Sequence, residues 1–366
     1  MFIANPPKLL LIAQSARMLV QLAVQAGYSA VVIDCFADQD TRQLALASIQ
    51  VDSLALADLQ PALAKLRAEH QCAYLIYGSG FEQHPLSLAY LEQHWRVLGN
   101  NAAVFTALQD KATFSRQLAD LQIPHSPCRF SAPAGQNWLF KPRYGQGGVG
   151  IRRTDSAVDL PAEQGYWQRY LPGKPMSLSF IAAAGQFRPL GLNRQWCQSV
   201  AGEDFLFAGI ANGGHLPDSQ YRQLLNSLTR LLTIYPLQGL GSLDFIQMNR
   251  QCYVLEINPR IPASAQLYDP QIFNWHVQAC LHGTLIELTA NFTPKAYQII
   301  YARQTVQIPH NLHWPAWTHD LPASGAIIGK GQPICSIIAS GETTRQAQSR
   351  LRQQQKIIEN LLNTGR

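Results

Sequence analysis

The chain has 366 residues, of which 47% are hydrophobic and 14% are charged, and its formal net charge is +6. This length allows two or three domains with a buried core, and the composition excludes a disordered chain. The basic residues are scattered rather than gathered in a run, so the positive charge does not indicate a nucleic acid as the main partner.

The cysteines and the N-terminus indicate the compartment. None of the seven cysteines forms a CxxC pair, and most lie in apolar surroundings, which favours buried free thiols in a reducing environment. The first residues lack a basic region followed by an apolar stretch and a cleavage site. No uninterrupted apolar run is long enough to cross a membrane. We therefore expect a cytoplasmic protein without a membrane partner.

The first part of the chain alternates between apolar runs and helical patterns. Strands are predicted at 8–13, 29–36 and 72–77, and helices at 15–26 and 61–70. This alternation predicts parallel βαβ units, so we expect a Rossmann-like domain over residues 1–101. Its first turn lacks the glycines of a dinucleotide-binding fingerprint. Gly78-Ser79-Gly80 ends a later strand and either faces a ligand or forms a simple turn.

The pattern changes after about residue 102. Helices are predicted at 110–121, at 219–232 and around 276–280, and strands at 138–141, 164–171, 177–183, 242–248 and 252–257. The tail holds strand-like pieces at 299–305 and 333–339 and ends in a polar helix at 343–362. We expect a second domain over residues 102–293, with a lid subdomain at about 125–170. A C-terminal β segment with a terminal helix is expected over residues 294–366.

A glycine-rich segment follows the strand at 138–141. Lys141 ends that strand, and Gly145, Gly147, Gly148 and Gly150 follow it. Glycines let backbone N–H groups approach phosphates, and a neighbouring lysine neutralises phosphate charge. A Rossmann loop would lead into a helix, whereas residues 151–154 have a strand pattern, which favours a strand–loop–strand lid over phosphates. A surface hairpin is the alternative.

Two acidic residues interrupt the apolar strands at 242–248 and 252–257. If residues 249–251 form a three-residue turn, Asp244 lies directly across from Glu256, and Asn258 points to the same face. A two-residue turn would place the acids on opposite faces. Two carboxylates and an amide oxygen suit Mg²⁺, and Arg260 just beyond them is placed to bind phosphate or a developing oxyanion. A solvent-facing hairpin with incidental acids is the alternative.

The predicted register also defines the opposite face of this hairpin. It places Leu243, Phe245, Leu255 and Ile257 together on an apolar face. Because adjacent carboxylates repel each other, replacing Glu256 by glutamine is expected to leave the fold intact and to stabilise it.

Taken in order, these motifs resemble the ATP-grasp superfamily over about residues 102–290. The most specific part is the run Glu256-Ile-Asn258-Pro-Arg260 with Asp244 upstream. The resemblance implies a mixed α/β and α+β architecture, in which a Rossmann-like (pre-ATP-grasp) domain precedes a two-subdomain ATP-grasp fold and a small C-terminal β segment. It also implies an ATP-dependent ligase that activates a carboxylate as an acyl phosphate and joins it to an amine. The layout is similar to small amino-acid ligases, such as the tyramine–glutamate ligase of methanofuran-type cofactor synthesis and the ligase of pyrrolysine synthesis.

The resemblance implies a role for each matching position. The implied ATP-phosphate ligands are Lys111, Lys141 and the lid glycines Gly145, Gly147, Gly148 and Gly150. The implied ligands of two Mg²⁺ ions, for which Mn²⁺ can substitute, are Asp244, Glu256 and Asn258, and Arg260 would stabilise the transferring phosphate or the tetrahedral intermediate. The backbone of Gln168, Arg169, Tyr170 and Leu171 would bind the adenine edge. Many members have a glutamate where this chain has Gln168, so the ribose ligand stays open.

Substrate contacts are expected at three further residues. Arg194 could grip a carboxylate, Asn212 could line the pocket and Ser264 could touch phosphate or substrate, whereas a surface arginine and a simple turn are the alternatives for the first two. The expected partners are a small-molecule carboxylate and an amine, and a homodimer is compatible with this interpretation. The rival functions are a carboxylase or small-molecule kinase on the same fold and a non-catalytic nucleotide-binding subunit.

Overall fold

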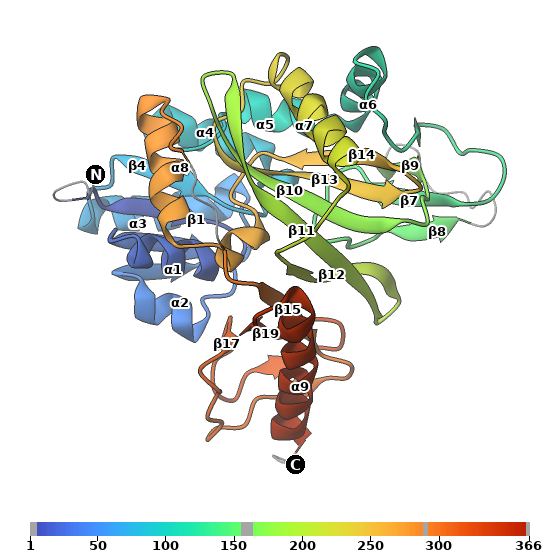
Figure 1. Cartoon of the computed structure of the whole chain (residues 1–366). Helices are drawn as coiled ribbons and strands as arrows, with labels where there is room; N and C mark the ends of the chain where they lie inside the picture. The colour runs from blue at the N-terminus through green and yellow to red at the C-terminus, as the bar shows by residue number, and fades with distance from the viewer. Residues whose placement is uncertain (1–5, 155–163, 288–291, 364–366) are drawn as a thin grey trace.

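The first part of the chain forms a five-stranded parallel sheet with the strand order β3-β2-β1-β4-β5 (Figure 1). The structure, a computed structural model, describes residues 6–154, 164–287 and 292–363. The strands are β1 (Leu9–Ile12), β2 (Ala30–Asp34), β3 (Ala47–Gln50), β4 (Tyr74–Tyr77) and β5 (Arg96–Val97). β1 and β2 are buried along their whole length, as expected for parallel strands covered on both faces.

Helices cover the two faces of this sheet. They are α1 (Arg17–Gln25), α2 (Gln39–Leu44), α3 (Leu56–Glu69), the 3-10 turn η1 (Phe81–Gln83) and α4 (Pro85–His94). Leu9 and Leu11 share an apolar cluster with α1, while Leu10 and Ile12 share another with α3 and α4. The predicted βαβ arrangement is therefore confirmed. The sequence pattern missed α2, β3, α4 and β5, because these elements are too short or too weakly periodic to stand out.

An eight-stranded antiparallel sheet follows, in the order β14-β13-β10-β11-β12-β15-β19-β17. Its strands are β10 (Lys174–Ala183), β11 (Gln186–Val200), β12 (Glu203–Ala211), β13 (Gly239–Met248), β14 (Gln251–Asn258), β15 (Lys295–Tyr301), β17 (Thr318–His319) and β19 (Pro333–Ser340). β15 pairs with β12, so the C-terminal strands extend the sheet that carries the acidic hairpin β13–β14. The long hairpin β11–β12 had no counterpart among the predicted elements.

A four-stranded sheet, in the order β6-β9-β7-β8, carries the glycine-rich loop. Its strands are β6 (Cys128–Arg129), β7 (Trp138–Pro142), β8 (Arg152–Thr154) and β9 (Gly165–Arg169). β7 pairs antiparallel with β8, with Trp138 opposite Thr154, so the predicted strand–loop–strand hairpin is confirmed. A separate two-stranded pair joins β16 (Val306–Gln307) and β18 (Ile327–Ile328).

The remaining helices pack on or beside the large sheet (Figure 1). They are α5 (Ala102–Gln109), α6 (Lys111–Asp120), α7 (Asp218–Leu232), η3 (Ala263–Leu267), α8 (Gln271–His282) and α9 (Thr344–Asn363). Phe273 and Val277 of α8 share one core cluster with Leu19 and Val20 of α1. This common core holds the first sheet against the large sheet. In the described ranges, no helix is long and apolar enough to cross a membrane.

Candidate active site

The two acids of the β13–β14 hairpin lie directly opposite each other. Asp244 pairs with Glu256, and Ser242 pairs with Asn258. Because strand residues two apart share a face, all four side chains point to the same side of the sheet. Ser242 Oγ donates to Asp244 Oδ1 at 3.0 Å, and Asn258 Nδ2 donates to Ser242 Oγ at 3.2 Å. The predicted juxtaposition of the acids and Asn258 is therefore confirmed.

The turn that connects these strands differs from the predicted one. Met248 pairs with Gln251, so the turn has the two residues 249–250 rather than three. Alone, this turn would have placed the acids on opposite faces. The register then shifts, because Leu255 forms a bulge in β14, and the extra residue restores the opposition of the acids. The prediction of a three-residue turn is wrong.

The bulge also changes the apolar face of the hairpin. Leu243, Phe245, Val254 and Ile257 are buried in the core cluster that includes α7. Leu255, which was predicted to lie with them, is half-buried and outside that cluster. The prediction for Leu255 is wrong because the bulge turns Val254 inward in its place.

Two lysines reach the acid pair from different elements. Helix α6 begins at Lys111 because the carboxylate of Asp110 caps it, accepting from Ala112 N at 3.1 Å. Lys111 Nζ donates to Glu256 Oε2 at 3.0 Å. Lys141 on β7 is close enough for its charge to act on Glu256 as well. The structure thus brings both predicted phosphate-binding lysines to the predicted metal ligands.

The two acids differ in charge state. The charge of Lys111 lowers the pKa of Glu256 to about 2 against the effect of burial, and Lys141 adds to the lowering. Burial raises the pKa of Asp244 to about 7, and the charge of Glu256 adds to the rise. Burial lowers the pKa of Lys141, which the charge of Glu256 opposes. Repulsion within the pair therefore disfavours the charged form of Asp244 rather than that of Glu256. We therefore expect a substitution of Asp244, and not Glu256→Gln, to stabilise the fold.

Asp244→Asn is expected to raise the Tm at pH 8 in metal-free buffer. The folded protein holds the Asp244 proton more tightly than the unfolded chain does, because the pKa is about 7 rather than 3.8. This contribution to stability is present below about pH 4 and is lost as the pH rises through 7. Wild type should therefore lose stability relative to the variant between these pH values. Thermal unfolding in EDTA measures the difference, and parallel Tm profiles would contradict the assignment.

Arg260 is held by Glu82, a residue that the sequence analysis did not single out. Glu82 Oε1 accepts from Arg260 Nε at 2.7 Å, and Glu82 Oε2 accepts from Gly80 N at 2.8 Å. Burial tends to lower the pKa of Arg260, but the charge and hydrogen bond of Glu82, together with the charges of Glu256 and Asp244, raise the pKa overall. Glu82 follows β4, so the first sheet orients the arginine of the hairpin. The available signal was the segment 78–80, since ligands of α/β sheets bind beyond the carboxyl ends of strands.

The glycine-rich loop lies against β12. Phe207 N donates to Gly147 O at 2.8 Å. At the neighbouring Gly148, an added Cβ would lie 1.9 Å from Phe205 O. The close approach of the two backbones therefore requires glycine at position 148.

The loop also reaches the first sheet. Gly150 N donates to Glu203 Oε2, in β12, at 2.7 Å. The side chain of Gln146 donates to that of Gln14, two residues after the end of β1. Gly145 has room for a Cβ, whose nearest neighbour would be 3.7 Å away. The loop thus connects the large sheet and the first sheet.

Gly148→Ala is expected to lift the loop from β12. Gly147 and Gly148 both have positive φ angles, 63° and 80°, so alanine strains the backbone at either position. Only at Gly148 does the methyl group collide with Phe205 O, because nothing lies within 4 Å of a Cβ at Gly147. Amide hydrogen exchange at Phe207 should accelerate roughly 5- to 10-fold in Gly148→Ala, as expected for loss of one hydrogen bond. The control Gly147→Ala should change it much less, and equal exchange in both variants would contradict the contact.

The segment predicted to bind adenine comprises the last two residues of β9 and the first two residues of the link to β10. The side chain of Gln168 is buried, so this position offers no exposed group for a ribose. Ser126 Oγ donates to Arg169 O at 2.6 Å, and Tyr170 N donates to a backbone oxygen of residue 137. Leu171 O accepts from the amide of residue 173. These bonds hold the segment between the small and the large sheet.

Ser264 belongs to a buried polar network beside the acids. Ser264 Oγ lies 2.7 Å from Ser179 Oγ, and Asn193 Nδ2 donates to Ser179 Oγ at 2.9 Å. Tyr268 OH donates to Asn193 Oδ1 at 2.7 Å. Ser179 pairs with Ser242 in the sheet, so the network continues the polar face of the hairpin.

The other two predicted substrate residues lie elsewhere. Asn212 is buried, and its amide is used by the backbone, since Oδ1 accepts from Lys295 N at 2.7 Å and Nδ2 donates to Leu267 O at 2.9 Å. Arg194 is exposed and pairs with Met176. Because side chains alternate along a strand, its side chain lies on the face of the sheet opposite to that of Asp244. The structure does not bring either residue to the acid pair.

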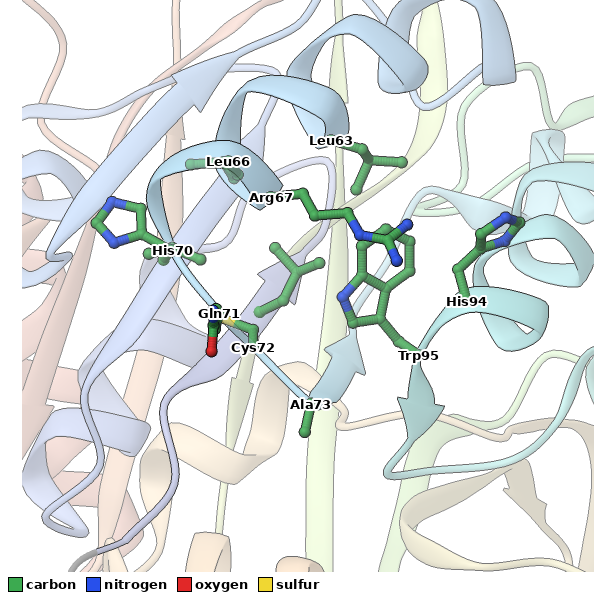
Figure 2. Close-up of a pocket in the computed structure, with 11 residues that line it drawn as sticks. Leu63, Leu66, Arg67, His70, Gln71, Cys72, Ala73, His94 and Trp95 are labelled. Carbon is green, nitrogen blue, oxygen red and sulfur yellow. The ribbon is translucent and has the colours of Figure 1, made fainter.

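A hollow of about 410 Å³ lies where the strands β4 and β5 of the first sheet begin (Figure 2). α3 and α4 contribute Arg67 and His94 to its lining, and Cys72 and Trp95 come just before β4 and β5. These strands begin at the hollow, whereas Glu82 follows the end of β4. The hollow is therefore separate from the polar face, and none of its lining residues was predicted as a site residue.

The donor atoms on the polar face fit Mg²⁺. The carboxylates of Asp244 and Glu256 and the amide of Asn258 supply hard oxygen ligands on one face. A divalent cation between the acids would offset the burial and repulsion that act on Asp244. Within the described ranges, no group of three or more His, Cys, Asp or Glu side chains could hold a metal. Water and phosphate oxygens would complete the shell, as is usual for Mg²⁺.

Known proteins share both a sequence segment and a fold with this chain. Residues 108–264 match the family described as the ATP-grasp domain. An uncharacterised protein from Methanocaldococcus jannaschii is 23% identical over 213 residues, which are 55% of this chain and 50% of that protein. The chain thus spans about half the length of this curated relative.

Two solved structures resemble nearly the whole chain. A biotin carboxylase from Campylobacter jejuni is similar with a TM-score of 0.74 and 15% identity, over 94% of this chain and 90% of that one. An L-amino acid ligase from Bacillus licheniformis is similar with a TM-score of 0.73 and 12% identity, over 97% and 98% of the two chains. At these identities the likeness is one of fold.

Proposed function

Because this chain carries an ATP-grasp domain in residues 108–264, we propose that it is an ADP-forming ligase that joins a carboxylate to an amine. The observation that carries the proposal is the meeting of Lys111, Lys141 and Arg260 with the acid pair Asp244–Glu256. The three cations suit the phosphates of ATP, and the acids suit Mg²⁺.

The proposed reaction has two steps. The substrate carboxylate attacks the γ-phosphate of ATP in line, which gives ADP and an acyl phosphate, and the amine then displaces phosphate from the acyl carbon. Mg²⁺, as two ions or with Mn²⁺ in its place, would be held by Asp244, Glu256 and Asn258 and would neutralise charge on the phosphates. Lys111 and Lys141 hold the phosphates in position. The glycine-rich loop covers the site and excludes the water that would hydrolyse the acyl phosphate.

The substrates are proposed to be an amino acid or a small cofactor precursor, as in methanofuran- or methylofuran-type biosynthesis, and an amine. The fold likeness to an L-amino acid ligase supports this choice.

The backbone of residues 168–171 is proposed to bind adenine, and Ser264 to border the substrate. We also propose domains at 1–101, 102–293, with the lid at about 125–170, and 294–366, in a cytoplasmic enzyme that can form a homodimer.

An ADP-release screen over paired carboxylic acids and amines tests this function. We expect Mg²⁺-dependent ADP release only when acid and amine are both present, together with a product whose mass equals their sum less one water. ADP release with a single acceptor would indicate a kinase, and release that needs bicarbonate would indicate a carboxylase. ATP binding without ADP release under any condition would indicate a non-catalytic nucleotide-binding subunit.

A further inference from the structure

Four carboxylates gather beyond the carboxyl end of β2, in a group that we call the Asp38 cluster. Asp34 ends β2, Asp38 and Asp40 lie at the start of α2, and Asp320 follows β17. The carboxylate of Asp40 accepts from Asp320 N at 2.9 Å and from Leu321 N at 3.0 Å. The cluster therefore lies where the C-terminal segment docks on the first sheet.

Three of these carboxylates have partners. Asp34 accepts from two backbone amides, at 2.8 and 3.3 Å. Asp320 accepts from Arg17 Nε at 2.8 Å and from Arg17 Nη2 at 3.1 Å, and Asp40 holds the two amides named above. Asp38 differs, since it is 9% exposed and its carboxylate has no hydrogen bond or ion pair with any residue that the structure describes.

The protein itself does not compensate the charge of Asp38. Burial raises the pKa of Asp38 to about 8, and the other three carboxylates of the cluster add to the rise. Arg17 opposes this effect only in part, because its guanidinium is already bonded to Asp320 and to two glutamines. A buried carboxylate without a partner is costly, and such groups are concentrated at binding sites.

The Asp38 cluster lies beyond the carboxyl ends of the strands of the first sheet, as do the residues that orient Arg260. Gln14, just after β1, connects the segment after β2 with the segment after β4. Its backbone carbonyl accepts from Cys35 N at 3.1 Å, and its backbone N–H donates to Ser79 O at 2.7 Å. Its side chain bonds to Gln146 of the glycine-rich loop. Ligands of open α/β sheets bind beyond the carboxyl ends of the strands. Asp38 and the Glu82–Arg260 pair therefore both lie beyond the carboxyl ends of the strands of the first sheet.

We propose that Asp38 binds the ammonium group of a small substrate, at a distance from the reacting carboxylate or amine. This inference rests on the proposed function, because it names the substrate class of the same site. An ammonium group supplies the positive charge and the N–H donors that Asp38 lacks. A metal ion is not favoured, since the other three carboxylates of the cluster are already bonded to backbone amides or to Arg17.

Two kinds of substrate carry such an ammonium group. One is an amino acid that reacts through a carboxylate, and the other is a diamine that reacts through its second amine. Isothermal titration calorimetry in the presence of MgADP distinguishes them, with the twenty L-amino acids and 1,4-diaminobutane as probes. Each probe that binds is compared with its analogue in which hydrogen replaces the ammonium group.

Asp38→Asn is the test variant, and Asp52→Asn, an exposed aspartate in the same part of the chain, is the matched control. Asp38→Asn should weaken binding of the ammonium probe roughly 10- to 100-fold, the effect of losing one charged hydrogen bond, and Asp52→Asn should not. The deaminated analogue should bind wild type and Asp38→Asn equally weakly. The Tm of Asp38→Asn should stay the same or rise, because the variant replaces a buried carboxyl group that has no partner by a neutral amide of the same size.

Three results would overturn the inference: unchanged affinity in Asp38→Asn, equal binding of the deaminated analogue to wild type, or no binding of any probe to wild type. The calorimetry does not depend on turnover. If the ADP-release screen finds no ligation while Asp38→Asn still weakens binding, the proposed function fails and the ammonium site stands. If ligation occurs and Asp38→Asn binds its substrates normally, only the ammonium site fails.

Discussion

Glu256→Gln is expected to lower ADP-forming turnover by at least about 100-fold, because a neutral amide cannot balance the metal charge that this position is proposed to hold. Glu256 is also the acid on which the charges of Lys111 and Lys141 both act. Glutamine has the same size and can still accept a hydrogen bond from Lys111, so the fold should persist. Turnover with a paired acid and amine at saturating Mg²⁺ is the measurement.

The control for this variant is Glu69→Gln, at the exposed end of α3, which should leave turnover unchanged. The Tm of Glu256→Gln should fall slightly, in contrast to that of Asp244→Asn. The fall should be small because the Glu256 side chain is 40% exposed, and ion pairs open to solvent contribute little stability. Full Mg²⁺-dependent turnover in Glu256→Gln would remove this residue from the metal site.

Arg260→Lys is expected to lower turnover roughly 100- to 1000-fold, the range seen when a donor to a developing negative charge is removed. The bond from Arg260 Nε to Glu82 orients the guanidinium, whose terminal nitrogens are proposed to donate to the transferring phosphate. Lysine keeps the positive charge but lacks this planar set of donors. The loss should therefore appear in kcat, while circular dichroism should remain that of the wild type.

Arg250→Lys is the matched control, because Arg250 is exposed at the turn of the same hairpin. It should turn over like the wild type. Glu82→Gln should give a smaller loss than Arg260→Lys, since the guanidinium remains but its charged partner is gone. Turnover in Arg260→Lys within about twofold of the Arg250→Lys control would exclude a role for Arg260 in stabilising the transferring phosphate.

The overall architecture could be predicted because it depends on local patterns. Apolar runs alternating with helical periodicity predicted the parallel sheet, and the glycine-rich loop between two strand patterns predicted the β7–β8 hairpin. The structure and its similarity to ATP-grasp proteins confirm the predicted order of a Rossmann-like domain, an ATP-grasp fold and a C-terminal β segment. Strands as short as β5 and β17 carry too few residues for a period to be seen.

The acid pair was predicted correctly from an incorrect turn. The sequence favoured one regular register, whereas the chain combines a two-residue turn with a bulge at Leu255, and the two departures cancel. A bulge leaves no mark in the pattern of apolar residues here, because Val254 and Leu255 are both apolar. Only the pairing of the two strands decides which of them is buried.

The amino-acid sequence by itself determined strands such as β1, β2 and β13, the glycine-rich loop and the run from Glu256 to Arg260, because each is a pattern among near neighbours. Only the tertiary structure decided which distant groups meet. Glu82 and Arg260 are 178 positions apart, and Asp40 and Asp320 are 280 apart. Such contacts have no periodic signal, since they arise when α8 packs on α1 and the C-terminal strands extend the large sheet. The orientation of Arg260 and the isolation of Asp38 therefore follow from packing between segments that the sequence keeps far apart.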